Sequence, residues 1–182
     1  MEPVSLQWPT AAFASQIAAY RQTFLQRGDT LAGCGSLARM EEPAEWLEQV
    51  RLLSNPETVP PNWVPCTQFL LVRECDKQIV GMIQIRHTFN PYVERYAGHI
   101  GYSVHPDFRH KGYATEMLRR VLPYCRSLGL ERVLITCAED NPASRKTILA
   151  NGGQYESTVF EPKNQVNLER YWIDLYQKDK LP

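Results

Sequence analysis

The sequence predicts a single α/β domain over residues 1–182, built on a mixed sheet with about four flanking helices. Segments of alternating or continuous apolar residues, typical of strands, are interspersed with segments whose apolar residues recur at every third or fourth position, typical of helices. A strand-like segment that is apolar almost throughout, 133–139, follows a long helical segment, as in a strand–helix–strand unit with parallel strands. With 182 residues, 43% of them hydrophobic, the chain is long enough for one sizeable core.

The N-terminal third is expected to hold one short strand and two helices. The strand covers residues 4–8, and Thr10 is the expected N-cap of the first helix, which ends at Gly28. The second helix begins near Pro43, because proline is favourable in the first turn. The proline-dense segment 55–65 is expected to be a loop inside the domain.

The middle of the chain is expected to form three strands and a long helix. Strands at 67–74 and 78–89 are separated by a three-residue turn, which favours an antiparallel hairpin. A third strand at 98–104 precedes a helix over about 111–128, and Gly129 ends that helix.

The C-terminal part is expected to close the sheet. The strand 133–139 is followed by a short helix that begins at Asn141 and Pro142, and then by strands at 154–160 and 168–176. Because the long helix connects them, strands 98–104 and 133–139 are expected to be parallel neighbours.

Composition excludes several classes of function. The chain has 20 basic and 20 acidic residues, so no global charge directs it to nucleic acid or to an anionic membrane. Its five cysteines are scattered, which favours reduced thiols in the cytoplasm over a disulfide framework or a zinc site. The N-terminus lacks the features of a signal peptide, and no apolar run approaches ~20 residues, so no membrane association is expected.

The connection between the third strand and the long helix predicts an anion site. The first amides of a helix have no intrahelical acceptor and carry the positive end of the helix dipole. Gly112 and Ala114 leave the backbone accessible there, while Arg109 and Lys111 add positive charge. A pyrophosphate can use several such donors at once. Neither a Walker loop nor a GxGxxG string occurs in the sequence.

The hexapeptide RHKGYA (109–114) fits the R/Q-x-x-G-x-G/A signature of the GNAT acyltransferases. The flanking GHIGYSVHPDFRHKGYATEML and VLITCAEDNPASRKTILANGG resemble the fourth strand with the third helix, and the fifth strand with the fourth helix, of that family. The resemblance is strong over about 67–176 and weak over 1–66. It implies a mostly antiparallel sheet in which one parallel pair of strands is splayed around the cofactor.

The resemblance also implies the ligand, which is acetyl-CoA or a close acyl-CoA, with no metal. Backbone amides from the helix start would hold the pyrophosphate, the end of the third strand would bind the pantetheine arm, and the start of the next helix would flank that arm. The residues implied are Tyr102, Val104, Arg109, His110, Lys111, Gly112, Tyr113, Ala114, Thr115, Asn141 and Ser144.

Three residues are candidates for the chemistry. His99, early in its strand, is the first candidate base, although strand alternation points it away from the face used by Tyr102. Glu139 ends the apolar strand, where α/β sites concentrate. Many relatives place a tyrosine in the fourth helix as general acid; here Ile148 occupies that region, and Tyr155 is a candidate substitute. Each also has an ordinary interpretation as a packing or solvated side chain.

The function expected from the resemblance is an N-acetyltransferase whose acceptor, a small-molecule or peptide amine, attacks acetyl-CoA directly in a ternary complex. The acceptor pocket would involve the first two helices and residues 161–167, with Trp63 and Tyr92 as candidate lining residues. A non-catalytic acyl-CoA-binding sensor or interaction module is the alternative, and an unrelated nucleotide-phosphate binder is a weaker one. Family members often form dimers, so a homodimer is an expectation.

Overall fold

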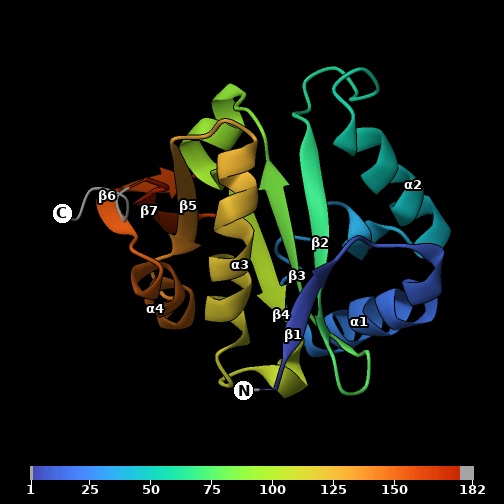
Figure 1. Cartoon of the computed structure of the whole chain (residues 1–182). Coiled ribbons are helices and arrows are strands. Elements are labelled where there is room, and N and C mark those ends of the chain that lie inside the picture. The colour runs from blue at the N-terminus through green and yellow to red at the C-terminus, as the bar shows by residue number, and fades with distance from the viewer. Residues whose placement is uncertain (1, 177–182) are drawn as a thin grey trace.

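The computed structural model describes residues 2–176 (Figure 1). It contains two antiparallel sheets, one of four strands in the order β1-β2-β3-β4 and one of three strands in the order β5-β7-β6. The mixed α/β fold class is therefore confirmed. The strands are β1 Val4–Gln7, β2 Cys66–Arg73, β3 Ile79–Arg86, β4 Ile100–Val104, β5 Arg132–Ala138, β6 Gln154–Glu161 and β7 Val166–Asp174.

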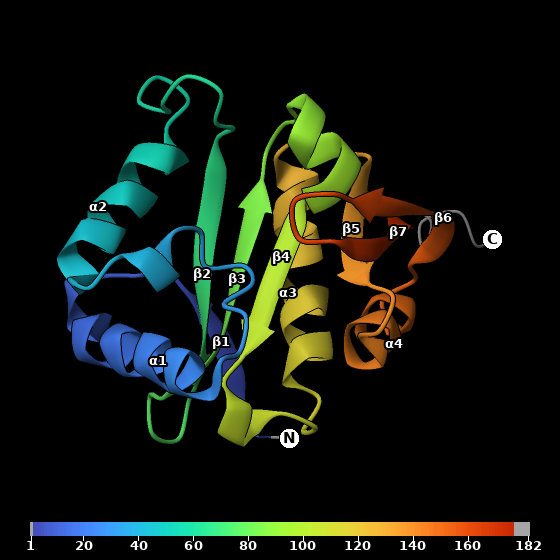
Figure 2. The same ribbon diagram turned by 180° about the vertical axis from the view of Figure 1, so that it is seen from behind.

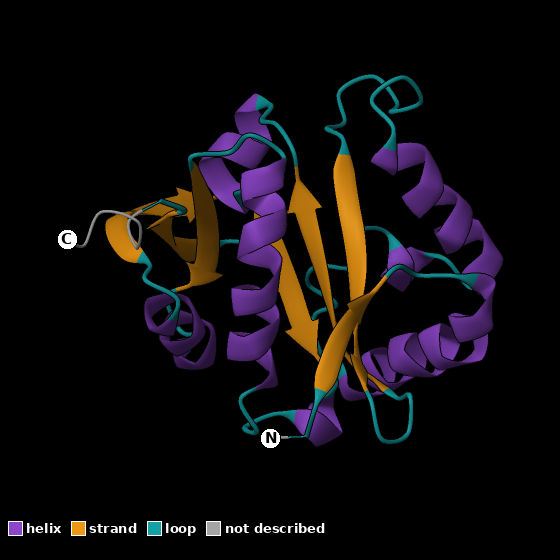
Figure 3. Ribbon diagram, in the orientation of Figure 1, coloured by secondary structure: helices purple, strands orange, loops and turns teal. Residues whose placement is uncertain are grey.

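Four α-helices accompany the sheets, as expected, and Figure 3 shows them by type. Short helical turns precede α1, α2 and α3, and a π-turn, Val93–Ala97, lies between β3 and β4. No pattern in the sequence predicts this π-turn. The helices are α1 Ala14–Arg27, α2 Pro43–Ser54, α3 Tyr113–Ser127 and α4 Pro142–Ala150.

The four-stranded sheet has a helical layer on each face. Alternation along β2 sends Leu70 and Val72 into one core with α1 and α2, and Phe69 and Leu71 into a second core with α3. Figures 1 and 2 show α3 across one face of this sheet and the α1–α2 pair against the other. This double coverage explains why β2 and β3 are buried along almost their whole length.

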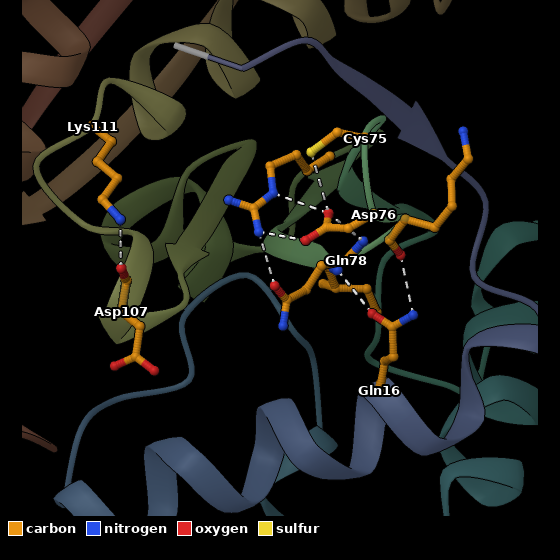
Figure 4. Close-up of polar contacts among 9 residues, drawn as sticks. Gln16, Cys75, Asp76, Gln78, Asp107 and Lys111 are labelled. Atoms are coloured by element: carbon orange, nitrogen blue, oxygen red, sulfur yellow. Dashed lines mark hydrogen bonds and ion pairs between the residues drawn. The ribbon is translucent and has the colours of Figure 1, made fainter.

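The start of α1 differs from the expectation. Thr10 makes no side-chain capping bond; it precedes a 3₁₀ turn, Ala11–Phe13, and α1 begins at Ala14. The helix is fixed instead by a tertiary contact with the β2–β3 turn (Figure 4). The Gln16 amide donates to the carbonyl of Lys77 at 3.1 Å and accepts from the N–H of Ile79 at 2.9 Å. A local capping signal could not reveal this contact.

The junction of the two sheets also differs from the expectation. No parallel ladder joins β4 and β5 in the described part of the chain; an isolated antiparallel-type bridge links Gly98 to Ile135. The physical reason lies in residues 98 and 99. Gly98 has a φ of +66°, and the ring Nδ1 of His99 accepts the Leu134 N–H at 2.9 Å, so this amide cannot enter a regular ladder. Beyond the bridge, β4 and β5 form opposite walls of a cleft.

Candidate active site

A cleft of about 890 Å³ opens between β4 and β5. Residues 101–104 form one wall, residues 136–138 form the other, and the N-terminal turns of α3 and α4 lie along its base. The loop after α1 also contributes, through Asp29, Thr30 and Ala32. The volume lies within the range of small-molecule sites, roughly 300–1,000 Å³.

The cleft gathers nearly all of the residues that the resemblance implied for the cofactor. Lys111 is the exception: its Nζ donates to the carbonyl of Asp107 at 3.0 Å, outside the cleft lining (Figure 4). The proximity of the others supports one shared site, although their role in binding stays a prediction. The residues that line the cleft are Tyr102, Val104, Arg109, His110, Gly112, Tyr113, Ala114, Thr115, Asn141 and Ser144.

The start of α3 has the geometry of an anion cradle. Gly112 is its N-cap, with a φ of +83°, a left-handed conformation that favours glycine. The helix begins at Tyr113, so the amides of Tyr113, Ala114 and Thr115 lie in the first turn, where no intrahelical acceptor exists. A glycine without a side chain, followed by free amides at the positive end of a helix dipole, fits a pyrophosphate.

Arg109 is not a free phosphate ligand, because its guanidinium is already bonded within the protein. Its Nη2 forms an ion pair of 2.8 Å with Asp29, and its Nε donates to the Val104 carbonyl at 3.3 Å. The guanidinium therefore neutralises a carboxylate that also lines the cleft, and it ties the loop after α1 to the end of β4. Asp29 was not identified from the sequence, because nothing local to it signals a partner eighty positions away.

Asn141 and Ser144 have definite roles at the start of α4. The Asn141 Oδ1 accepts the Ser144 N–H at 3.0 Å, which confirms Asn141 as the N-cap. The Ser144 hydroxyl lies 2.9 Å from the phenolic oxygen of Tyr102, which crosses from β4. Burial raises the pKa of Tyr102 to about 12, so its phenol remains protonated near neutral pH. The pair presents hydroxyl protons at the cleft.

The environment of His99 argues against its expected role as the catalytic base. The side chain is 5% exposed, lies between Phe89 and Trp172, and does not line the cleft. Its Nδ1 is occupied by the Leu134 N–H. Burial, together with the charge of Arg86, lowers the pKa of His99 to about 4. His99 instead fastens β4 to β5.

The positions of Glu139 and Tyr155 also argue against catalytic roles. Glu139 is exposed, accepts the Asn167 side-chain amide at 3.0 Å and does not line the cleft. Tyr155 is 57% exposed on β6, outside the cleft lining, and its hydroxyl lies 2.9 Å from the Thr158 hydroxyl. Strand position alone could not show on which side of the second sheet these groups would lie.

The β5 wall adds residues that the sequence analysis did not assign to the site, namely Thr136, Cys137 and Ala138. Cys137 is 5% exposed, and burial raises its pKa to about 11, so its thiol remains protonated. Cys137 is therefore better interpreted as a small core residue than as a nucleophile. The nearby Glu169 carboxylate is held by Arg145 at 2.7 and 2.8 Å and accepts the Tyr171 hydroxyl at 2.8 Å.

Within residues 2–176, no cluster of three or more histidine, cysteine, aspartate or glutamate side chains has the arrangement of a metal site. In the same range, no helix combines the length and apolar character that crossing a bilayer requires.

Comparisons with known proteins agree with this geometry. The chain matches the family model for the acetyltransferase (GNAT) domain over residues 11–154. The search of curated proteins found no match. Among solved structures, the ribosomal-protein-S5-alanine acetyltransferase from Vibrio fischeri has 17% identity and a TM-score of 0.73, with 97% of this chain and 96% of that chain covered.

Two further structures extend the comparison. RimJ from Mycobacterium smegmatis, in complex with CoA-disulfide, has 17% identity and a TM-score of 0.72, covering 98% of this chain and 84% of that chain. The microcin C7 self-immunity acetyltransferase MccE, in complex with acetyl-CoA and AMP, has 18% identity and a TM-score of 0.69, covering 94% and 92%. These likenesses show a shared fold, and the family model spans most of the sequence; the chain belongs to the GNAT acetyltransferase family.

Proposed function

We propose that the protein is an N-acetyltransferase that moves an acetyl group from acetyl-CoA directly to a primary amine in a ternary complex. The observation that carries this proposal is the cleft between β4 and β5, with the first-turn amides of α3 at its base. A diphosphate at those amides would direct the rest of a long acyl-CoA along the cleft, between the diverging strands.

Successive groups along the cleft fit successive parts of coenzyme A. The amides of Tyr113, Ala114 and Thr115 would hold the diphosphate. The β4 wall would hydrogen-bond the pantetheine arm, and Asn141 and Ser144 would flank that arm from α4. Bound acetyl-CoA supplies a thioester that an amine can attack.

Stabilisation of the leaving thiolate is assigned to the Tyr102–Ser144 pair. Both side chains line the cleft, and their hydroxyl oxygens lie 2.9 Å apart. Either hydroxyl can donate a hydrogen bond to a departing thiolate, which then takes its proton from solvent, because a phenol with a pKa of about 12 is too weak an acid to protonate it. A thiol has an ordinary pKa of about 8.5, so the leaving group needs only modest help. The proton of the acceptor amine would leave through solvent.

One observation favours a second candidate function, a non-catalytic acyl-CoA sensor or interaction module. Neither His99, Glu139 nor Tyr155 lines the cleft. His110 does line it, but next to Gly112 at the anion end. A site with this composition would hold the cofactor even without an efficient base.

Two measurements test these functions. Calorimetric titration with CoA and with acetyl-CoA measures binding, with ATP as the control for a general nucleotide site. Release of free thiol from acetyl-CoA, measured with a panel of amines and with mass detection of the products, measures turnover. Turnover with any amine supports the enzyme, and binding without turnover across the panel supports the sensor. Failure of CoA to bind refutes both.

The location and assembly of the protein are also proposals. All five cysteines are free thiols, which supports a reducing compartment such as the cytoplasm. A homodimer stays an expectation from the family, to be measured by light scattering.

A further inference from the structure

Arg86, the last residue of β3, has hydrogen-bonding capacity that the protein does not use. Its Nη1 donates to the carbonyls of Ala97 and Gly98, at 3.4 and 3.2 Å, at the end of the π-turn. A guanidinium carries five N–H donors. Within the described residues, the Nε–H and the two N–H groups of Nη2 have no acceptor, and Arg86 forms no ion pair. The unused edge, Nε with Nη2, is one that binds a carboxylate by two parallel hydrogen bonds.

The surroundings of Arg86 do not compensate its charge. The side chain is half-buried, and burial lowers the pKa of its guanidinium. The ionisable groups that act on it are the Cys66 thiol and the Tyr92 phenol, both neutral near pH 7 because burial raises their pKa values. A partly desolvated cation without a counterion is unfavourable unless another molecule provides one.

The carboxylate of Glu161, which acts electrostatically on Tyr92, is already engaged elsewhere. It accepts the backbone N–H groups of Lys163 and Asn164 at 2.9 and 2.8 Å, and the Asn164 side-chain amide at 2.7 Å. These bonds hold the β6–β7 turn together. Glu161 therefore stabilises its own loop and is not positioned by an ion pair with Arg86.

Arg86 does not itself line the cleft, but it lies next to the Gly101 wall, at the end of β4 away from the anion cradle. Gly101, in the β4 wall, lines the cleft, and a Cβ built on it would lie 3.9 Å from the Arg86 Nη1. The same position would lie 3.3 Å from the backbone of Gly33, in the loop after α1. The loop after α1 therefore reaches this part of β4, and β6 contacts the π-turn.

The two aromatic residues expected at the acceptor pocket separate in the structure. Tyr92, 47% exposed, is an electrostatic neighbour of Arg86. Trp63, 46% exposed, lines a different, smaller groove against α2, with Leu52 and Leu53. Only Tyr92 therefore belongs to the region around Arg86.

We infer that Arg86 is a specificity-determining residue that binds a carboxylate of the acceptor through its Nε–Nη2 edge. Because Arg86 lies so near the cleft wall, the carboxylate and the reacting amine must be only a few bonds apart, as in a free amino acid. The same positive charge disfavours polyamines, which carry no group to neutralise it. This inference rests on the proposed function, because it identifies the acceptor class of that site.

The wild-type protein provides the first test. Dissociation constants are measured by calorimetry in the presence of CoA for free amino acids, for the matching amino acid amides, for alanyl peptide amides and for spermidine. At least one free amino acid should bind about 10- to 100-fold more tightly than its amide, the effect of one charge-assisted carboxylate contact. Equal binding of acid and amide, a preference for peptide amides or spermidine, or no binding of any amino acid overturns the inference.

Variants provide the second test. Arg86→Lys keeps the charge and loses the planar pair of donors, and the preference for the acid over its amide should fall. Arg86→Gln loses both the charge and the pair of donors, and the preference should disappear. Arg120→Gln, on the exposed side of α3, removes the same charge far from this region and should keep the preference. CoA affinity and thermal unfolding of each variant report on folding, because Arg86 also caps the π-turn. If Arg86→Gln does not fold, the comparison of acids, amides and spermidine on the wild-type protein tests the inference by itself.

The outcomes distinguish this inference from the proposed function. Tight CoA binding with acetylation of amines that lack a carboxylate would refute the role of Arg86 and keep the enzyme. Absence of CoA binding would refute the enzyme itself.

Discussion

Substitution of Gly112 by aspartate tests the anion cradle most directly. The residue precedes the three free amides of α3 and has a φ of +83°. An aspartate there would place a carboxylate where the diphosphate is expected. Each charge-assisted hydrogen bond contributes roughly 1.5–3 kcal/mol, so the loss of two would cost about 3–6 kcal/mol, or roughly 10²- to 10⁴-fold in CoA affinity.

The same substitution should affect the fold only moderately. A non-glycine residue in the left-handed region costs roughly 1–2 kcal/mol, and aspartate tolerates that region better than most residues. Its charge at a helix N-terminus returns about 0.3–1 kcal/mol. Urea unfolding of the variant should therefore remain cooperative, with a small shift of the midpoint.

Gly129 supplies a matched control. It lies at the other end of α3 with a φ of +82°, and a Cβ added there would meet nothing within 4 Å. Gly129→Asp should lose at least as much stability, because its carboxylate would lie at the negative end of the helix dipole, and it should keep its CoA affinity. Gly112→Ala separates strain from charge and should weaken CoA binding less than Gly112→Asp. Wild-type affinity for CoA in Gly112→Asp, measured by calorimetry, would refute the placement of the diphosphate.

Three further predictions concern Tyr102, Arg109 and His99. Tyr102→Phe should lower kcat for thiol release about tenfold with little change in CoA affinity, because a hydrogen-bond donor to the leaving thiolate is lost while the ring remains; a loss confined to CoA affinity would contradict this role. Arg109→Gln should weaken CoA binding about tenfold, since Asp29 would face the phosphates unpaired. The double variant Arg109→Gln with Asp29→Asn should recover most of that loss, and failure to recover would exclude charge as the cause. The folded-state pKa of His99, about 4, lies below its ordinary value of 6.5, so the unfolded chain binds the proton first as the pH falls. Stability should therefore be complete above about pH 6.5 and decrease between pH 6.5 and 4; His99→Gln should show less of this decrease in urea midpoints, and an unchanged pH profile in that variant would contradict the assignment.

Local patterns in the sequence predicted the elements and the anion end of the cleft. Strand-like runs separated by a three-residue turn indicated β2 and β3, and three-to-four periodicity indicated α3, because the helical period follows directly from backbone geometry. The cradle was predictable for the same reason: Gly112, the small Ala114 and the helix that follows are contiguous in the chain. Asn141 was likewise recognisable as an N-cap, because a cap and its helix are adjacent.

The tertiary structure alone decided which charges face one another and which groups reach the acceptor end. Arg109 is paired with Asp29 from a loop far away in the sequence, and His99 is fixed by Leu134 across the two sheets. Arg86 is distinguished by the absence, within the described residues, of acceptors for its Nε and Nη2 groups, and this depends on where the neighbouring strands and loops lie. Hydrogen bonds and ion pairs between distant segments depend on angstrom-scale packing, and no periodicity or spacing in the chain encodes it.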